Sequence, residues 1–243
     1  MPEQLWFTEL LNRLFGPMAA SLLSHIGIKV ANPAAPINNI VAMELLVTVL
    51  LIAFFFLVRM RLSPDNPGAL QHIAEMAEEF ISGQAHEIIG HDYRPHVAYL
   101  MTVGFFILFC NLLGLVPGFE SPTASPAVPL GCAITTFVYY NFYGIRRHGA
   151  HYIKQFMGPV LGLSPVMFAI EVISHLARIL SLTVRLYANM FAGDMVTIAF
   201  FSLVPILVPV AFLGLHLFVS LVQTFIFVVL TMVYVGLAVS EEH

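Results

Sequence analysis

The stretch SLTVRLYANMFAGD, residues 181–194, places one arginine, Arg185, inside a long apolar part of the chain. The surrounding run, from Gly158 to Val239, is apolar enough to lie in lipid. A guanidinium stays protonated at physiological pH, and its burial at membrane depth costs from a few to more than about 10 kcal/mol. An arginine in this position therefore indicates a function, and the length of the apolar run predicts helices that cross a membrane.

The composition of the whole chain agrees with a membrane protein. Of its 243 residues, 59% are hydrophobic and 10% are charged, whereas a soluble domain carries about 25% charged residues. The net charge of −4 argues against a nucleic-acid partner, which would require a basic surface. Cys110 and Cys132 lie in apolar runs, so they indicate neither a disulfide scaffold nor a metal site. We expect no cofactor.

We predict an all-α membrane protein with five membrane-crossing helices. The clearest span is the apolar run at 40–58, where Glu44 is the only charge and the length is close to the ~20 residues needed to cross a bilayer. Spans at about 97–116 and 128–145 follow. The predicted organisation is one multi-pass domain over residues 1–243, divided into an N-terminal interfacial segment at 1–36, a first span at 37–61, a cytoplasmic amphipathic segment at 62–93, second and third spans within 94–157, and a final hairpin at 158–243.

Two further features of this organisation follow from spacing and length. Apolar residues recur at helical spacing near the N-terminus and over 69–89, which predicts amphipathic helices at the membrane surface. The last two apolar stretches, about 159–201 and 203–239, are longer than one perpendicular crossing needs. We therefore expect them to form a strongly tilted hairpin.

Basic residues set the expected orientation. Arg59 and Arg61 follow the first span, and Arg146, Arg147 and Lys154 follow the third. Alternating spans place both groups on one side, which the positive-inside rule makes cytoplasmic. The N-terminus and the 117–127 loop are then outside, and the C-terminus is inside.

Polar residues before and after Arg185 fall on one face of its helix. At ~100° per residue, Arg178 and Glu171 lie about 20° and 40° from Arg185, and Ser181 and Asn189 each lie about 40° away. A polar seam between packed helices is one explanation, since Ser and Asn join membrane helices. We favour an ion pathway, because ionisable groups inside a membrane mark such pathways.

The last apolar stretch carries His216, Ser220 and Gln223 on one helical face. If the hairpin is antiparallel with Gln223 level with Arg185, Asp194 lies about 14 Å outward on one helix and His216 about 11 Å outward on the other. An acid and an imidazole then arrive at similar depth from two helices. Proton relays in membranes use such groups, so we predict an outer proton path here.

A second polar set lies on the cytoplasmic side of Arg185 and consists of Glu171, Ser174 and His175. The chain thus carries two polar tracks, one opening inward and one outward, with a permanent cation between them. A fixed positive charge resists direct passage of protons from one track to the other. Arg185 is therefore predicted to act as an electrostatic gate.

These residues carry a family resemblance. The run R-L-Y-A-N-M-F-A-G-D at 185–194, the His-x6-Gln pair and the run Q-T-F-I-F at 223–227 resemble subunit a of the F-type ATP synthase, the stator of the membrane motor. The resemblance assigns the essential arginine to Arg185. It assigns the other path residues to Asn189, Asp194, His216, Gln223 and, on the cytoplasmic side, Glu171. The family often has glutamate where this chain has the shorter Asp194.

The resemblance also implies partners and a location. A ring of c subunits would rotate past Arg185, a b-type peripheral stalk would hold the stator, and the rest of the F0F1 complex would carry out ATP chemistry. The chain has no G-x4-G-K-[ST] loop, so direct nucleotide binding and catalysis by this chain alone are not expected. The expected location is the bacterial plasma (inner) membrane. Whether H⁺ or Na⁺ is the coupling ion depends on the ring.

Two other classes of protein are alternatives. A secondary ion transporter or antiporter would usually show internal repeats and broken helices, and the sequence shows no such repeat. An intramembrane hydrolase would need a nucleophile and a base in register. Ser174 and His175 are adjacent, so their side chains diverge by ~100° on a helix.

Overall fold

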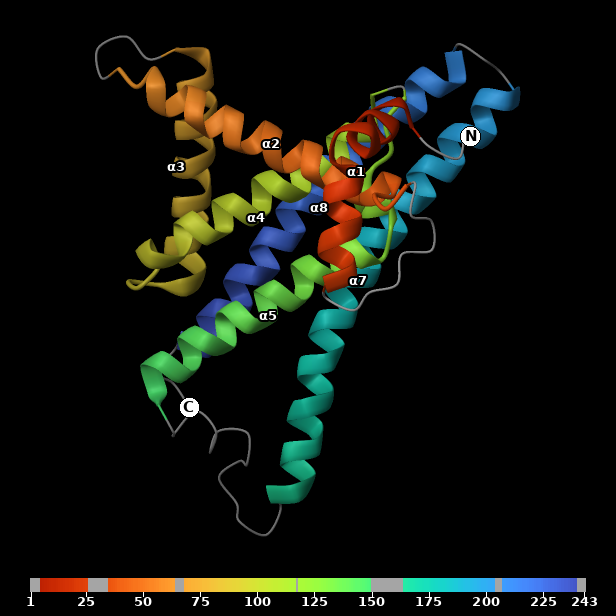
Figure 1. Cartoon of the computed structure of the whole chain (residues 1–243). Helices are drawn as coiled ribbons and strands as arrows, with labels where there is room; N and C mark the ends of the chain where they lie inside the picture. Colours follow the sequence, from red (N-terminus) through yellow and green to blue (C-terminus); the bar gives the residue numbers. More distant parts are fainter. Residues whose placement is uncertain are drawn as a thin grey trace.

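The computed structural model describes residues 5–25, 35–63, 68–116, 118–149, 164–203 and 207–239, and all regular structure in these ranges is helical. The prediction of an all-α fold is therefore confirmed. The elements are α1 (Trp6–His25), α2 (Asn39–Met60), α3 (Ala69–Ile89), α4 (Arg94–Leu113), the 3-10 helix η1 (Pro122–Ala124), α5 (Ala127–His148), α7 (Ser164–Leu203) and α8 (Leu207–Val239) (Figure 1).

Four helices within the described ranges are long and apolar enough to cross a membrane. They are α2, α4, the part of α7 from Val166 to Phe200, and the part of α8 from Val210 to Val239. The predicted third span is helical, as α5, but is not among the four. Its 22 residues include tyrosines, threonines and Asn141, which lower its hydropathy. A crossing by α5 therefore stays a prediction.

Helix α8 is the centre of the bundle, and α3, α4, α5 and α7 all pack against it. Its buried side chains include Phe227, Val228, Met232 and Val235. A helix that is apolar on most of its faces can pack against several other helices at once, as α8 does. Figure 1 shows that the end of α7 and the start of α8 lie close together and that the two helices diverge toward their other ends. Helix α5 packs against both.

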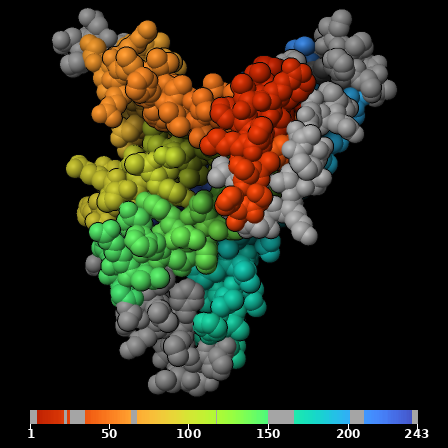
Figure 2. Space-filling model, in the orientation of Figure 1, coloured from red at the N-terminus to blue at the C-terminus, as the bar shows by residue number. Residues whose placement is uncertain are grey.

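The N-terminal helix α1 is attached to the start of α2 by side-chain hydrogen bonds. The Asn12 amide donates to the backbone oxygen of Ile37 and accepts from its nitrogen, both at 3.0 Å. Asn38 caps α2 by accepting from the Val41 nitrogen. Large apolar residues of α1, such as Trp6 and Phe15, remain exposed, and the helix lies on the molecular surface (Figure 2). This exposure agrees with the predicted interfacial helix, whose position in a membrane stays a prediction.

The proline-rich segment after α4 folds back into the bundle, which the sequence did not predict. Ser121 donates a hydrogen bond to the Cys110 carbonyl, and the Thr123 hydroxyl donates to Asn111 Oδ1 at 2.6 Å. Gly114 permits this approach, since a Cβ there would lie 2.7 Å from Ser121 Cβ. Both Pro122 and Thr123 are buried, so η1 closes one end of the helical bundle.

Candidate functional site

The polar residues of α7 and α8 meet along the line where the two helices pack. Asn189 Nδ2 donates a hydrogen bond to Gln223 Oε1 at 2.8 Å. Gln223 is therefore level with Asn189 and not with Arg185, as the sequence analysis assumed. The shift is one helical turn, or about 6 Å. It arises because side-chain packing, which spacing along one helix does not reveal, sets the register of two helices.

The predicted acid–imidazole pair forms one turn further along. Asp194 Oδ1 lies 3.6 Å from His216 Nδ1, and the exposed fractions of the two side chains are 26% and 3%. The backbone of α7 carries Gly193 beside the imidazole, where a Cβ would lie 3.2 Å from His216 Nδ1. The absence of a side chain at this glycine lets the ring lie against α7. The expectation that Asp194 and His216 reach similar depth is confirmed.

The other ring nitrogen of this histidine is buried without a hydrogen-bond partner among the described residues. A buried polar atom without a partner costs free energy unless water or another group satisfies it. His216 Nε2 is thus a point at which a bound water molecule would be stabilised.

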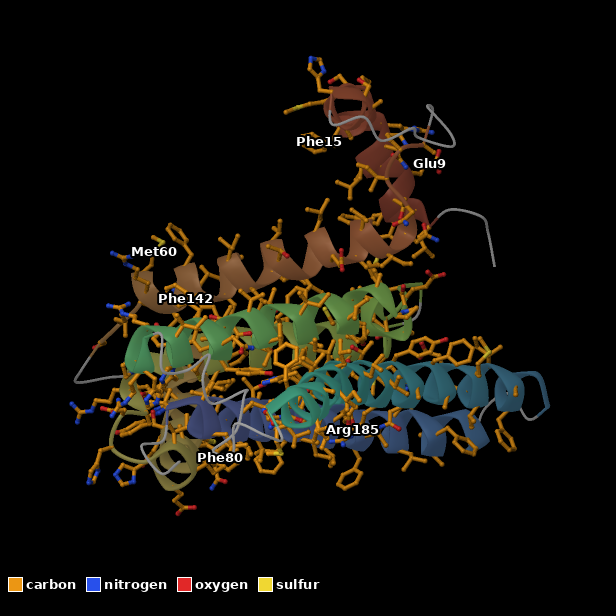
Figure 3. All side chains as sticks on the ribbon, turned by 90° about the horizontal axis from the view of Figure 1, so that it is seen from below. Glu9, Phe15, Met60, Phe80, Phe142 and Arg185 are labelled. Carbon is orange, nitrogen blue, oxygen red and sulfur yellow. The ribbon has the colours of Figure 1, made fainter. Side chains whose placement is uncertain are left out.

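Arg185 lies on α7 (Figure 3). Its Nη2 donates a hydrogen bond to Ser181 Oγ at 3.3 Å, one turn away. Of the ion pairs formed within the described ranges, none involves this guanidinium. Because a carboxylate is the usual partner of an arginine in a membrane, the arrangement leaves a charged donor available to a group from another chain.

The surface of α7 around Arg185 combines small and apolar residues. Small exposed residues flank the arginine at successive turns of the helix: Ala177, Ser181, Ala188 and Ala192. Larger exposed residues on the same helix, such as Val184 and Phe191, are apolar. Small side chains allow close approach of a second membrane helix, so this surface is suited to contact another helix at the level of the arginine.

On the other side of Arg185, a second acid–imidazole pair lies within one turn of α7. His175 Nε2 is 3.5 Å from Glu171 Oε1. The hydroxyl of Tyr140, from α5, lies 2.7 Å from His175 Nδ1. Arg178 lies over the Tyr234 ring of α8, 5.2 Å from its centroid, a cation–π contact.

The predicted inner set is therefore brought together only in part. Ser174 is half-buried, and its hydroxyl makes no hydrogen bond within the described part of the chain. The structure instead adds Tyr140, which the sequence analysis missed. Its signal was weak, because Tyr140 is one of several tyrosines in α5 and no spacing rule connects α5 with α7.

Two further polar features near Asp194 and His216 were also missed. Glu120, which precedes η1, lies close enough to Asp194 to interact with it electrostatically. Asn111 of α4 is fully buried, and its amide nitrogen lies 3.4 Å from both the Ser220 carbonyl and the Thr224 hydroxyl of α8. Asn111 thereby connects η1 to the helix that carries His216. In the sequence, the only signals for these two residues were that Glu120 is an acid in a loop and that Asn111 is a single asparagine in an apolar helix.

Metal binding finds no support among the residues that the structure describes, which hold no group of three or more His, Cys, Asp or Glu side chains suited to an ion. The chemistry available to the site is proton binding and transfer at carboxylate and imidazole groups, together with the fixed charge of Arg185.

Known proteins resemble the chain over nearly its whole length. The family model described as ATP synthase A chain matches residues 41–236. ATP synthase subunit a of Koribacter versatilis is 56% identical over 245 residues, which cover 100% of both chains. The subunit a of Solibacter usitatus is 50% identical over 214 residues, covering 88% of this chain and 92% of the relative.

A third relative, ATP synthase subunit a 3 of Pelobacter propionicus, is 38% identical over 237 residues and covers 98% of this chain and 97% of its own. These matches confirm the family resemblance that the sequence motifs indicated. The apolar helices of the structure are consistent with the same family. The chain therefore belongs to the ATP synthase subunit a family, a membrane component of ATP synthesis and proton transport.

Proposed function

We propose that this chain is the proton-translocating stator subunit of the F0 sector. Two offset half-paths, separated by Arg185, deliver protons to and from carboxylates on a ring of c subunits. A membrane potential supplies about 2.3 kcal/mol per proton per 100 mV. Coupled proton movement turns the ring and drives ATP synthesis on the other subunits of the F0F1 complex.

The observation that carries this proposal is the state of Arg185. Its side chain hydrogen-bonds Ser181 and pairs with no acid among the described residues, while small side chains flank it on an exposed apolar surface. A carboxylate on a passing ring helix would satisfy the guanidinium, which in turn favours the ionised form of that carboxylate. The same fixed charge blocks direct flow of protons between the half-paths.

The outer half-path uses Asp194, His216, Asn189 and Gln223. Asp194 and His216 are 3.6 Å apart, and the amides of Asn189 and Gln223 are joined at 2.8 Å. A proton taken up at the acid–imidazole pair would travel along the α7–α8 contact, past the amide pair, to a ring carboxylate near Arg185. Water would bridge the remaining steps, since the amides themselves carry no titratable proton.

The inner half-path uses Glu171, Ser174 and His175. Glu171 and His175 are 3.5 Å apart, and they lie about 21 and 15 Å along α7 from Arg185. The Glu171 side chain is 41% exposed, so water can reach the acid. Ser174 belongs to this path by its position on α7.

The membrane placement follows from the same proposal. Helix α5 would cross as a fifth span, shielded from lipid by its contacts with α7 and α8. The long hairpin would be strongly tilted, because α7 and α8 extend about 60 and 50 Å at 1.5 Å per residue. The N-terminus would be outside and the C-terminus cytoplasmic, in the inner membrane of a bacterium. The c ring and a b-type peripheral stalk would be the direct partners.

Replacement of Arg185 tests the proposal. In the assembled complex, Arg185→Ala is expected to stop ATP synthesis and to let protons leak between the half-paths. Arg185→Lys is expected to fail in coupled turnover, because lysine lacks the planar fork and can lose its proton at depth. The measurements are ATP synthesis and passive proton flux in membrane vesicles, with assembly checked by subunit stoichiometry.

Arg178→Ala is the matched control, since it removes the same charge from the same helix seven residues away. It is expected to keep the membrane tight to protons. An assembled Arg185→Ala complex that is tight and still synthesises ATP would overturn the proposal.

A further inference from the structure

We propose that Tyr140 is a positioning residue of the inner half-path, where it holds His175 in the orientation that presents an N–H group to Glu171. This inference rests on the proposed function and deepens it. It assigns to α5 a part in proton release, in addition to its packing against α7 and α8.

The contacts of His175 carry the inference. Its Nδ1 lies 2.7 Å from the Tyr140 hydroxyl, and its Nε2 lies 3.5 Å from Glu171 Oε1. The rings of Tyr140 and His175 are also nearly parallel, with an interplanar angle of 17° and centroids 5.9 Å apart. Phe137, one turn earlier on α5, contacts the same imidazole edge-on at 5.7 Å. The ring is thus fixed in plane and in direction.

These contacts select one tautomer of neutral His175. An ionised carboxylate only accepts hydrogen bonds, so we assign the proton of neutral His175 to Nε2, the nitrogen that lies 3.5 Å from Glu171 Oε1. The other nitrogen, Nδ1, is then an acceptor, and the Tyr140 hydroxyl donates to it. Tyr140 therefore stabilises the tautomer whose Nε2–H points to the carboxylate. In metal sites, a residue that hydrogen-bonds the second ring nitrogen of a metal-binding histidine fixes the tautomer in the same way.

The three groups run from the interior toward the surface. The exposed fraction is 2% for Tyr140 and 7% for His175, and it is 41% for the Glu171 side chain. Glu171 is the group that water can reach. In the proposed step, a proton released by a ring carboxyl passes through water to a Glu171 carboxylate oxygen and then to cytoplasmic water. His175 keeps its Nε2 proton and donates a hydrogen bond to the ionised carboxylate.

Other charged and titratable groups surround this set. On α7, Arg178 follows His175 by three residues and acts on it electrostatically. On α8, the Tyr234 ring lies 5.9 Å from that of Tyr140 and under the Arg178 guanidinium.

Tyr140→Phe tests the inference, because it keeps the ring and removes the hydroxyl. In vesicles that contain the assembled F0 sector, proton flux toward the cytoplasmic side is measured while pH on that side alone is varied. We expect a flux about 3- to 10-fold lower, the range for loss of one buried hydrogen bond, and a shifted midpoint of the pH profile. His175→Leu should also shift the profile, and Tyr140→Phe should add nothing to His175→Leu.

Tyr139→Phe is the matched control. Tyr139 is the neighbouring residue on α5 and also contacts an imidazole through its hydroxyl, that of His96 at 3.0 Å. It belongs to a different pair, so the pH profile should not move. A wild-type profile for Tyr140→Phe, or additive effects of Tyr140→Phe and His175→Leu, would overturn the inference. The proposed function would still stand if Arg185→Ala leaks, and it would fall on its own if that variant stays tight and active.

Discussion

On the side of Arg185 that we propose to be outer, the acid and the imidazole come from two helices, whereas on the side that we propose to be inner they come from one turn of α7. Asp194 meets His216 across the α7–α8 contact at 3.6 Å, and Glu171 meets His175 along α7 at 3.5 Å. The distances are alike, but the outer pair exists only while the two helices stay in register. The inner pair is built into α7, and α5 supplies only its orientation.

This difference predicts which changes each site tolerates. A substitution that moves α8 relative to α7 should disturb the outer pair and leave the inner pair intact. A substitution in α5 should do the reverse.

The largest effect is expected from removal of both outer groups. Asp194→Asn alone should slow proton uptake without preventing assembly, because His216 lies at similar depth and can partly substitute. Asp194→Asn combined with His216→Leu should lower flux by about 100-fold or more, the range for loss of proton-transfer groups. Flux in reconstituted vesicles is the measurement. Effects of the two single changes that simply multiply in the double variant would contradict a shared relay.

Gly193→Ala should break the outer site through packing alone. The added Cβ would lie 3.2 Å from His216 Nδ1, so the imidazole must move away from α7. We expect outer-path flux to fall about tenfold, consistent with about 1.4 kcal/mol, and the inner pH profile to stay as it is. Gly214→Ala is the control, since a Cβ there meets nothing within 4 Å. Equal flux in the two variants would show that the close packing of Gly193 against the His216 ring is not needed for the outer path.

Thr123→Val tests the connection between η1 and the outer site. It removes the hydroxyl that donates to Asn111 Oδ1 at 2.6 Å and leaves a buried acceptor unpaired. We expect a loss of about 1–3 kcal/mol in stability, seen as a lower unfolding temperature of the purified complex. Thr135→Val, whose hydroxyl bonds the backbone of its own helix, should change that temperature less. The opposite ranking would mean that η1 contributes little to the bundle.

The smallest effect is expected from Glu120→Gln at the outer mouth. Glu120 is half-buried and acts on Asp194 electrostatically. Loss of one such charge should reduce the rate of proton uptake about two- to fivefold. The reduction should shrink at high ionic strength, because salt screens exposed charges. A reduction that does not depend on salt would argue for a packing effect.

Spacing along single helices predicted much of this structure. The stripe at 69–89 gave the bounds of α3, and the apolar run at 40–58 gave α2 within two residues. The meeting of Asp194 and His216 followed from helical rise and an antiparallel hairpin. These predictions succeeded because each depends on geometry within one helix or on a short connection.

The remaining features depend on packing between distant segments. The register of α7 and α8 differs by one turn from the assumed one, because Asn189 bonds to Gln223. The contact between Tyr140 and His175, and the burial of Thr123 against Asn111, join helices whose relative positions no periodicity specifies. The sequence shows which residues share a helical face, and the tertiary packing decides what that face meets.

The Arg185 guanidinium, which pairs with no acid within the described ranges, has a consequence for the biogenesis of the chain. Before a partner is present, this charge lies on a surface suited to lipid, which raises the free energy of the newly inserted protein. Any partner that binds only the folded chain and supplies a carboxylate lowers that free energy by mass action. We therefore expect the orphan chain to be short-lived in the membrane and subject to proteolysis, and pulse-chase turnover should slow when the partner is co-expressed.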